Sequence, residues 1–183
     1  MEFRHEWKHE INYGDMLEIR QRMRAIGRVD ENSIDGKYQI RSLYFDTPSD
    51  RALREKLDGV SCREKFRIRY YNGDTTLIHL EKKSKRSGLG NKQTAILRAE
   101  EAQAIADGSL DWMPHCDRPL VQELYVKMKV QGLRPKTIVD YTREAFTYAP
   151  GNVRVTLDYN IRTGLFCTQL LDTDCIISMP CRI

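Results

Sequence analysis

Apolar and polar residues alternate along several stretches of the chain, a pattern typical of β-strands with one buried face. This alternation predicts strands at 2–11, 38–46, 63–71, 75–83, 92–97, 136–148 and 153–159. The clearest pair is 63–71 with 75–83, because Asn72, Gly73 and Asp74 between them are typical of a hairpin turn. We therefore expect an antiparallel sheet that is rich in hairpins.

Apolar residues with helical spacing separate these strands. They predict helices at 16–26, 51–57, 98–106 and 120–131, the first opened by Asn12 and Asp15 and stopped by Gly27. The basic, glycine-containing segment 82–90 is expected to be a mobile loop. The pattern predicts an α+β fold with helices outside the sheet, and the length of 183 residues predicts one domain, 1–183.

Charged residues fall on one face of several predicted strands, because every second side chain of a strand points the same way. An ordinary solvated sheet face explains any one such strand. The set is nevertheless weighted towards arginine, whose planar fork matches phosphate oxygens. The shared faces are Arg4, Glu6, Lys8 and Glu10; Lys65, Arg67 and Arg69; His79, Glu81 and Lys83; Tyr141 and Arg143; and Arg154, Thr156 and Asp158.

Inward-facing cations without partners are costly to bury. A closed barrel with a basic, water-filled lumen that binds a polyanion satisfies this condition. The pattern therefore favours an antiparallel β-barrel tunnel with helices packed outside, and a ligand such as a polyphosphate or a nucleoside triphosphate.

The composition of the chain argues against several classes of protein. The net charge is only +4, with 30 basic and 26 acidic residues, which does not suggest a surface that coats nucleic acid. No apolar run is long enough to span a bilayer, and the first residues lack the pattern of a signal peptide, so a cytoplasmic location is expected. Five cysteines without a CxxC pair favour reduced thiols over a zinc site or a disulfide framework.

Six segments in order resemble a known family. They are Arg4–Lys8 (RHEWK), Ser42–Asp46 (SLYFD), Phe66–Arg69 (FRIR), Leu80–Lys83 (LEKK), Asp140–Phe146 (DYTREAF) and Val153–Asp158 (VRVTLD). The resemblance is to the VTC domain, the polyphosphate polymerase domain of the vacuolar transporter chaperone proteins, within the CYTH-like triphosphate tunnel metalloenzymes. It extends over about residues 2–166.

The resemblance implies an eight-stranded antiparallel tunnel that binds ATP and Mn²⁺ or Mg²⁺ and transfers the γ-phosphate to inorganic polyphosphate. Carried over to this sequence, the catalytic group is Lys8, Arg67, Arg69 and Arg143. The phosphate-binding set adds Lys83 and Arg154, with Arg4 and Tyr141 as further members. Glu6 and Glu81 are the metal candidates, since these ions prefer oxygen ligands. An ion pair that holds a neighbouring Arg or Lys explains either carboxylate equally well.

Two departures from the family pattern change these expectations. Arg4 stands where the CYTH branch usually has the first Glu of Glu-x-Glu-x-Lys, which favours the VTC branch. The family normally ends on a strand carrying Glu-x-Lys, whereas residues 167–183 contain no Glu. We therefore expect 167–183 to be divergent or truncated and the last strand to be lacking, so phosphate binding is better supported than turnover.

Three alternatives remain open from the sequence. The same fold hydrolyses triphosphates when water is the acceptor, and it can serve as a non-catalytic polyphosphate-binding module. A nucleic-acid binder is suggested by the basic run 82–86, but that run lacks interleaved aromatic residues for base stacking. VTC relatives often work beside membrane proteins, so a membrane-protein partner is compatible with the family, although no residue here indicates one.

Overall fold

A strongly curved antiparallel sheet forms the centre of the protein. The computed structural model describes residues 6–87, 89–165 and 167–172. Its sheet has seven strands in the order β1-β6-β2-β3-β4-β5, with β7 paired to β6. The bounds are β1 Arg28–Val29, β2 Tyr38–Asp46, β3 Cys62–Tyr71, β4 Asp74–Arg86, β5 Leu89–Leu97, β6 Arg134–Tyr148 and β7 Val153–Leu165.

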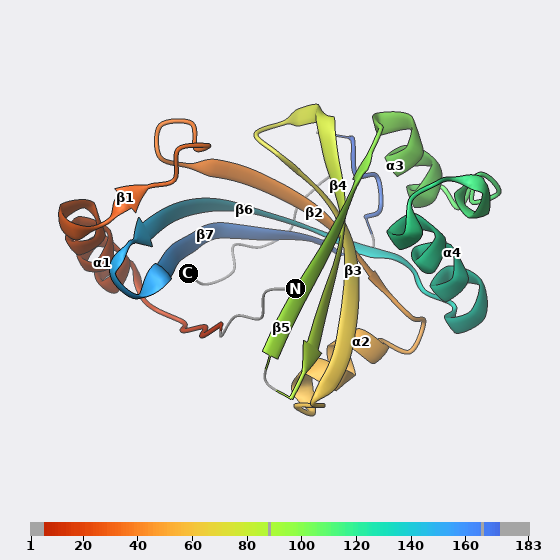
Figure 1. Ribbon diagram of the computed structural model, residues 1–183, viewed down its shortest axis with the longest axis horizontal. Coiled ribbons are helices and arrows are strands. Elements are labelled where there is room, and N and C mark those ends of the chain that lie inside the picture. The colour runs from red at the N-terminus through yellow and green to blue at the C-terminus, as the bar shows by residue number, and fades with distance from the viewer. Residues whose placement is uncertain (1–5, 88, 166, 173–183) are drawn as a thin grey trace.

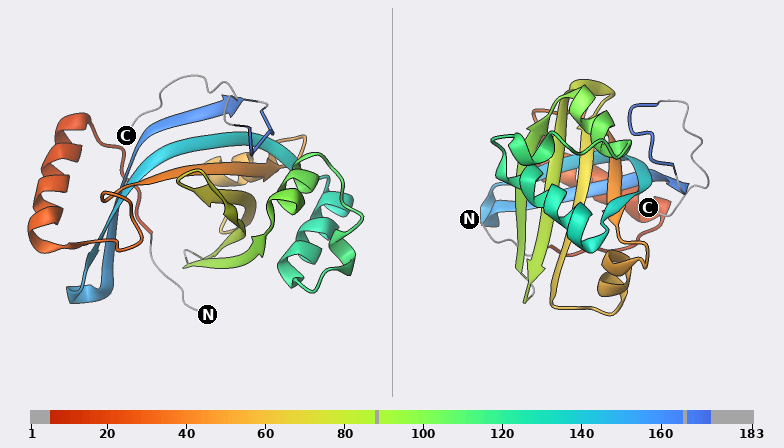
Figure 2. Two further views of the ribbon diagram at one scale, coloured as in Figure 1. Left: turned by 90° about the horizontal axis from the view of Figure 1, so that it is seen from above. Right: turned by 90° about the vertical axis from the view of Figure 1, so that its right-hand side faces the viewer.

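The helices lie outside this sheet. They are α1 Tyr13–Ile26, α2 Arg51–Leu57, α3 Ala99–Ala106 and α4 Pro119–Gln131, with short 3₁₀ turns at Met113–His115 and Pro150–Asn152. The strands coil so far that β3, β4 and β5 cross the direction of β2, β6 and β7 (Figure 1). Seen from above, the sheet arches between α1 at one end and α3 with α4 at the other (Figure 2). The result is a half-barrel with a convex and a concave face.

The convex face carries the main hydrophobic core. Leu43, Phe66, Ile68 and Leu80 are fully or almost fully buried there, and they pack in one cluster with residues of α3 and α4 such as Leu124. A second cluster lies under α1. Its members are Met16 and Met23 of the helix with Phe146 and Leu157 of the sheet.

Local capping explains where the helices begin. Asn12 accepts from the backbone N–H of Asp15, and the Asp15 side chain accepts from the Asn12 N–H, so α1 opens with a complete capping box. Asp46 accepts from the N–H groups of Ala52 and Leu53 and thereby caps α2. Gly132 ends α4 in the left-handed conformation, with φ of 66°.

The α+β class, the curled antiparallel sheet and its helical cover are confirmed. Two local predictions are wrong. The part of the predicted strand 2–11 that the structure describes, residues 6–11, is irregular, because it pairs with no strand there. Residues 82–86 and 89–90 of the predicted loop instead belong to β4 and β5, because pairs such as Lys85 with Gly90 continue the ladder.

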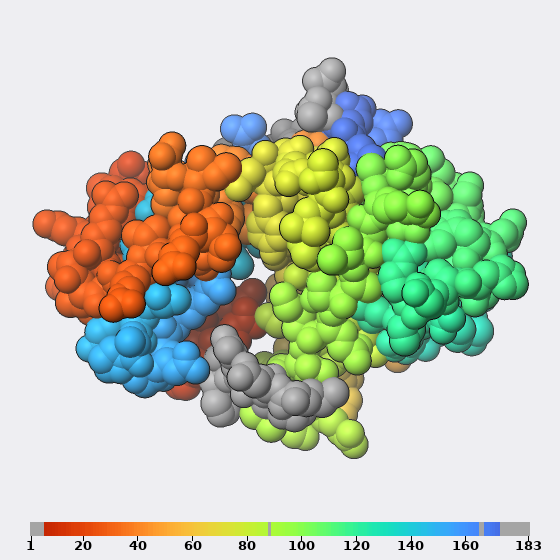
Figure 3. All heavy atoms as spheres, turned by 45° about the horizontal axis from the view of Figure 1, so that its top comes forward, coloured from red at the N-terminus to blue at the C-terminus, as the bar shows by residue number. Residues whose placement is uncertain are grey.

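The described residues form seven strands that do not close into the eight-stranded tunnel implied by the resemblance. Neither β5 nor β7 has a second strand neighbour there, so the sheet stays open between them. Figure 3 looks into the resulting hollow, between the part built from α1, β1 and the turn that joins β6 to β7, and the part built from β4 and β5. The segment 167–172 does not extend the sheet; it covers the convex side, where Tyr70 donates to the Leu170 carbonyl.

The cysteines divide into two groups. Cys62 and Cys116 carry free thiols, as expected. Cys167 is disulfide-bonded, so the expectation of reduced thiols is wrong for this residue. Cys175 and Cys181 lie outside the described residues. Among the described helices, none combines the length and the apolar character needed to cross a membrane.

Candidate functional site

Strand register places successive rows of side chains across the concave face. Each row joins residues directly opposite one another on neighbouring strands, so their side chains lie side by side. The rows are Lys65, Lys83 and Lys92; then Tyr44, Arg67, Glu81 and Thr94; then Ser42, Arg69, His79 and Ile96; and then Ile40 with Tyr71.

Glu81 pairs with two cations in the second row. Its Oε2 lies 2.7 Å from Arg67 Nε and 2.5 Å from Arg67 Nη2, and its Oε1 lies 3.2 Å from Lys92 Nζ. Burial alone would raise the pKa of Glu81, but Arg67, Arg69 and Lys92 together hold this pKa at about 2. Glu81 is therefore ionised at neutral pH and balances part of the local positive charge.

Arg69 is the most deeply buried cation of the face, with 3% of its surface exposed. Its Nε donates to Ser42 Oγ at 2.8 Å and its Nη2 donates to Tyr141 Oη at 2.7 Å. The guanidinium also lies 5.8 Å from the ring centroid of Tyr71 and 5.7 Å from that of Tyr141. None of the described carboxylates lies within ion-pair distance of Arg69, so its direct hydrogen-bond partners are neutral, and Glu81 acts on its charge only at longer range.

Lys65 likewise forms no ion pair with any described residue; its Nζ lies 5.5 Å from the ring centroid of Tyr44. Burial lowers the pKa of Lys65, and the nearby Lys8, Arg67 and Lys83 lower it further. Burial would raise the pKa of Tyr44, but the charges of Arg67, Lys65 and Arg69 bring it down to about 8. Neighbouring positive charge thus acts on both groups: it is what lowers the pKa of Tyr44, and it adds to burial in lowering the pKa of Lys65.

Arg143 lies on the same face, one strand beyond β2. Its Nε and Nη2 each lie 2.6 Å from an oxygen of Asp158 on β7, a bidentate pair across the two strands. Its guanidinium is 5.3 Å from the ring centroid of Tyr141. Burial lowers the pKa of Arg143, but Asp158 outweighs burial and raises it, so this arginine is charged and largely compensated.

The remaining predicted residues lie at the edges of the face or beyond the described chain. Lys83 Nζ is 2.5 Å from Glu6 Oε2, and Lys8 Nζ is 3.8 Å from Glu6 Oε1. The Lys8 side chain is 77% exposed. Arg154 forms a 2.7 Å pair with Asp30, whose side chain is 13% exposed. Arg4 lies outside the described residues.

Arg67, Arg69, Lys83, Tyr141, Arg143 and Glu81 thus meet on one face, as strand alternation predicted. A match to the family model described as VTC domain covers residues 3–179.

The chain belongs to the VTC domain family.

A solved structure agrees at the level of the fold. A Bacillus halodurans protein, provisionally described as an adenylate cyclase, superimposes with a TM-score of 0.50 and 13% sequence identity. The match covers 82% of this VTC domain and 68% of the other chain. The likeness shows that the curled sheet with its outer helices is a CYTH-like fold. The comparison with curated proteins gave no match.

The carboxylates of this VTC domain constrain how it can hold a metal ion. Within the described parts of the chain, no three His, Cys, Asp or Glu residues cluster as a metal site. Glu81 and Glu6 already bind lysine or arginine. This donor set still fits Mg²⁺ or Mn²⁺ in one way, because such ions are commonly bound by one or two carboxylates while phosphate and water supply the rest.

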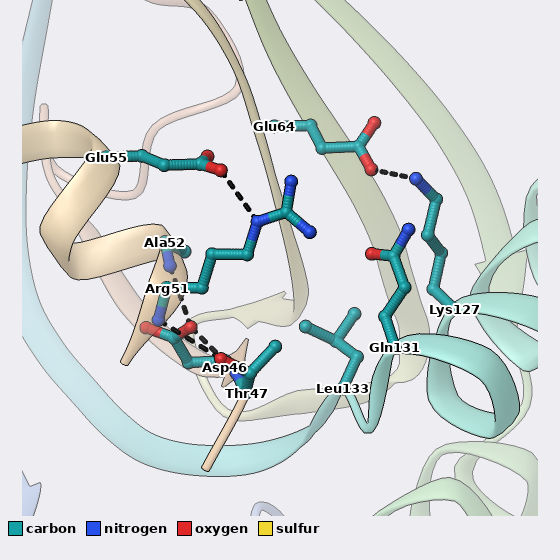
Figure 4. Close-up of a pocket in the computed structure, with 9 residues that line it drawn as sticks. All are labelled: Asp46, Thr47, Arg51, Ala52, Glu55, Glu64, Lys127, Gln131 and Leu133. Atoms are coloured by element: carbon teal, nitrogen blue, oxygen red, sulfur yellow. Dashed lines mark hydrogen bonds and ion pairs between the residues drawn. The ribbon is translucent and has the colours of Figure 1, made fainter. Parts of the chain in front are cut away.

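Three concave residues were not among the predicted site residues: Lys65, Lys92 and Tyr44. Alternation had already placed Lys65 on the face of Arg67 and Arg69, although not among the site residues, whereas the places of Lys92 and Tyr44 depend on the pairing of separate strands. A separate pocket lies on the convex side between α2 and α4 (Figure 4). It contains none of the predicted site residues, and its charged groups are paired, Arg51 with Glu55 and Lys127 with Glu64.

Proposed function

We propose that this VTC domain binds the phosphates of ATP and inorganic polyphosphate on its concave face and transfers the γ-phosphate of ATP to the polyphosphate chain. The observation that carries the proposal is the positive charge of Lys65 and Arg69, neither of which forms a direct ion pair with a described residue. An unpaired cation on a partly enclosed surface is costly, and a polyanion offsets that cost. The convex face contrasts with this, since its lysines Lys82 and Lys127 are paired with glutamates.

Phosphoryl transfer requires little covalent chemistry from the protein. The bond between the γ-phosphorus and its bridging oxygen breaks, a terminal oxygen of polyphosphate bonds to that phosphorus, and ADP leaves. Lys65, Arg67 and Lys83 would hold the phosphates in line and stabilise the charge that develops on their oxygens. Arg69 lies beneath them at the floor of the sheet and adds charge, while Arg143 would contact the ligand from β6.

A divalent cation, when bound, would neutralise phosphate charge and polarise the phosphorus–oxygen bonds. Glu81 is the carboxylate best placed to take part, because it lies in the row next to the three lysines. Its present partners Arg67 and Lys92 are themselves phosphate-binding candidates. Ligand binding would therefore compete for the same cations and release carboxylate oxygens for the metal.

Incubation with ATP, Mn²⁺ and a short polyphosphate primer tests the proposal. We expect longer polyphosphate on a gel and an equal amount of ADP. The Lys65→Ala variant should lose at least about ten-fold in activity, since phosphate contacts of this kind contribute one to several kcal/mol. Lys56→Ala, which removes the same charge from the exposed surface of α2, should leave the rate unchanged.

A second candidate is a binding module without turnover. The open sheet and the ion-paired carboxylates favour it, because both leave fewer groups to hold a metal in a closed site. Tight binding of tripolyphosphate without turnover of ATP under any divalent metal supports this candidate over the enzyme. Release of orthophosphate alone, without chain growth, supports hydrolysis. Failure of wild-type protein to bind tripolyphosphate contradicts every phosphate-binding form of the proposal.

A further inference from the structure

The concave face changes character along the direction of β3. Its lysine row gives way to arginines and then to aromatic and apolar residues. At that end Tyr71 lies edge-to-face with Tyr38 and with His79, with ring centroids 6.0 Å apart in both pairs. Ile40 and Tyr141 belong to the same apolar cluster as these tyrosines. This cluster lies on the polar side of the sheet, separate from the two convex cores.

The four aromatic residues of this end differ in how deeply they are buried. Tyr38 and Tyr141 are 8% exposed and form a packed base. Tyr71 and His79 are half-buried, and neither side chain forms a hydrogen bond within the described chain. Ile96, directly opposite His79 on β5, is 57% exposed. The side chains of Tyr71 and His79 therefore present ring surface and free polar atoms together, beside an exposed apolar neighbour.

The aromatic end is joined to the cationic region through Arg69. Its guanidinium lies 5.8 Å from the Tyr71 ring centroid, and Arg69 faces His79 across the β3–β4 pair. Two residues along a strand span about 7 Å, so Lys65, Arg67, Arg69 and Tyr71 form a line with three cations and then an aromatic ring. A nucleoside triphosphate has the same polarity, with a chain of anionic groups at one end and an aromatic base at the other.

We propose that Tyr71 and His79 form the nucleobase subsite of this VTC domain. This inference rests on the proposed function and adds the orientation in which ATP lies along the concave face. The base stacks at Tyr71 and His79, the α-phosphate lies near Arg69, and the γ-phosphate points towards the row of Lys65, Lys83 and Lys92. A polyphosphate chain has no base, so it uses the cationic rows alone.

Binding of two ligands to matched variants tests the subsite. The ligands are ATP and inorganic tripolyphosphate, titrated calorimetrically into the full chain. For Tyr71→Leu we expect the ATP affinity to fall by about five-fold or more, the scale of one lost base–aromatic stack. The tripolyphosphate affinity should stay within about two-fold of the wild-type value. Tyr71→Phe keeps the ring and should retain ATP affinity.

Tyr13→Leu serves as the control, because Tyr13 lies on α1 and is 62% exposed. Thermal unfolding of each variant shows whether the fold is intact. If Tyr71→Leu and His79→Leu, both folded, leave ATP affinity unchanged, the subsite is wrong. Equal losses for ATP and tripolyphosphate also overturn it, since Tyr71 would then act through Arg69.

Discussion

The convex and concave sides of the sheet differ in how completely their cations are paired with carboxylates. On the convex face Lys82 contacts both Glu64 and Glu123, and Lys127 contacts Glu64, so each cation has a carboxylate. On the concave face Arg67 and Arg143 are paired, but Lys65 and Arg69 are not paired with any described residue. The same backbone strands supply both faces, through alternate residues. The comparison shows that charge alone does not single out a candidate binding surface in this protein, whereas incomplete pairing of the cations does.

The two sides of the sheet are also expected to contribute differently to stability and to ligand binding. The convex face buries apolar side chains against α3 and α4, which is the main favourable contribution to folding. The concave face contains the stabilising pair of Glu81 with Arg67, but also Lys65 and Arg69, which form no ion pair with a described residue and add little stability without a ligand. Variants on either side of the sheet should therefore affect different measurements.

The largest effect is expected for Glu81→Gln, which leaves Arg67 without its carboxylate. Removing one partner of a buried ion pair costs roughly 3–5 kcal/mol, so the free energy of unfolding at pH 7 should fall by that amount. Denaturant titration measures it. Tripolyphosphate should restore more stability to the variant than to the wild type, because it supplies the missing negative charge. Equal stabilisation of both proteins would contradict the link between Glu81 and the ligand.

The same residue predicts an acid dependence. The pKa of Glu81 is lowered to about 2 in the folded protein, from 4.5. Its stabilising contribution is therefore present above about pH 4.5 and lost as the pH falls through 2. The shift corresponds to roughly 3 kcal/mol. Glu81→Gln should remove this part of the acid-induced loss of stability.

Leu80→Ala tests the convex face, because Leu80 is the neighbour of Glu81 on β4 and points to the opposite side of the sheet. Leu80 is fully buried in the main core, so its truncation should cost about 2–5 kcal/mol of unfolding free energy. Tripolyphosphate affinity of the folded fraction should not change. A large loss of affinity would show that the two faces are coupled through the strand, contrary to the separation argued above.

For Arg69→Met we expect the reverse of the result for Leu80→Ala: a loss of ligand affinity with little loss of stability. The unfolding free energy should change by less than about 1 kcal/mol, because the lost hydrogen bonds to Ser42 and Tyr141 are offset by removal of an unpaired buried charge. Tripolyphosphate affinity should fall by about ten- to a hundred-fold. Arg54→Met, which removes the same charge from the exposed surface of α2, is the matched control. Strong destabilisation by Arg69→Met would mean that the arginine is structural.

The smallest effect concerns Tyr44, whose pKa is about 8. Above this pH a tyrosinate beside Arg67 reduces the positive charge, so tripolyphosphate affinity should fall about five-fold between pH 7 and pH 9. Stability should move the other way. A pKa lowered from 10 contributes stability that increases as the pH rises from 8 towards 10. Tyr44→Phe should abolish both trends; if the affinity still falls, another group is responsible.

Much of this fold was predictable from the pattern of the chain. Alternation located β2 and the β3–β4 hairpin, and helical spacing located α1 and α4, with Asn12 marking the start of α1. These elements are determined locally, by side-chain periodicity and capping. The segment 2–11 also alternates, but its described residues lack a pairing strand, and alternation cannot supply one. The prediction of a loop at 82–90 was wrong for the converse reason, since cross-strand hydrogen bonds between β4 and β5 outweigh the loop-like composition of this segment.

The sequence by itself determined that Lys65, Arg67 and Arg69 share a face, because the two-residue period of a strand follows from backbone geometry. Only the tertiary structure decided which of these cations is compensated. Glu81 and Asp158 reach Arg67 and Arg143 through register with neighbouring strands, while Ser42 and Tyr141 offer Arg69 only hydroxyl groups. Electrostatic compensation depends on distances of a few ångströms between separate strands, and those distances exist only once the sheet has formed.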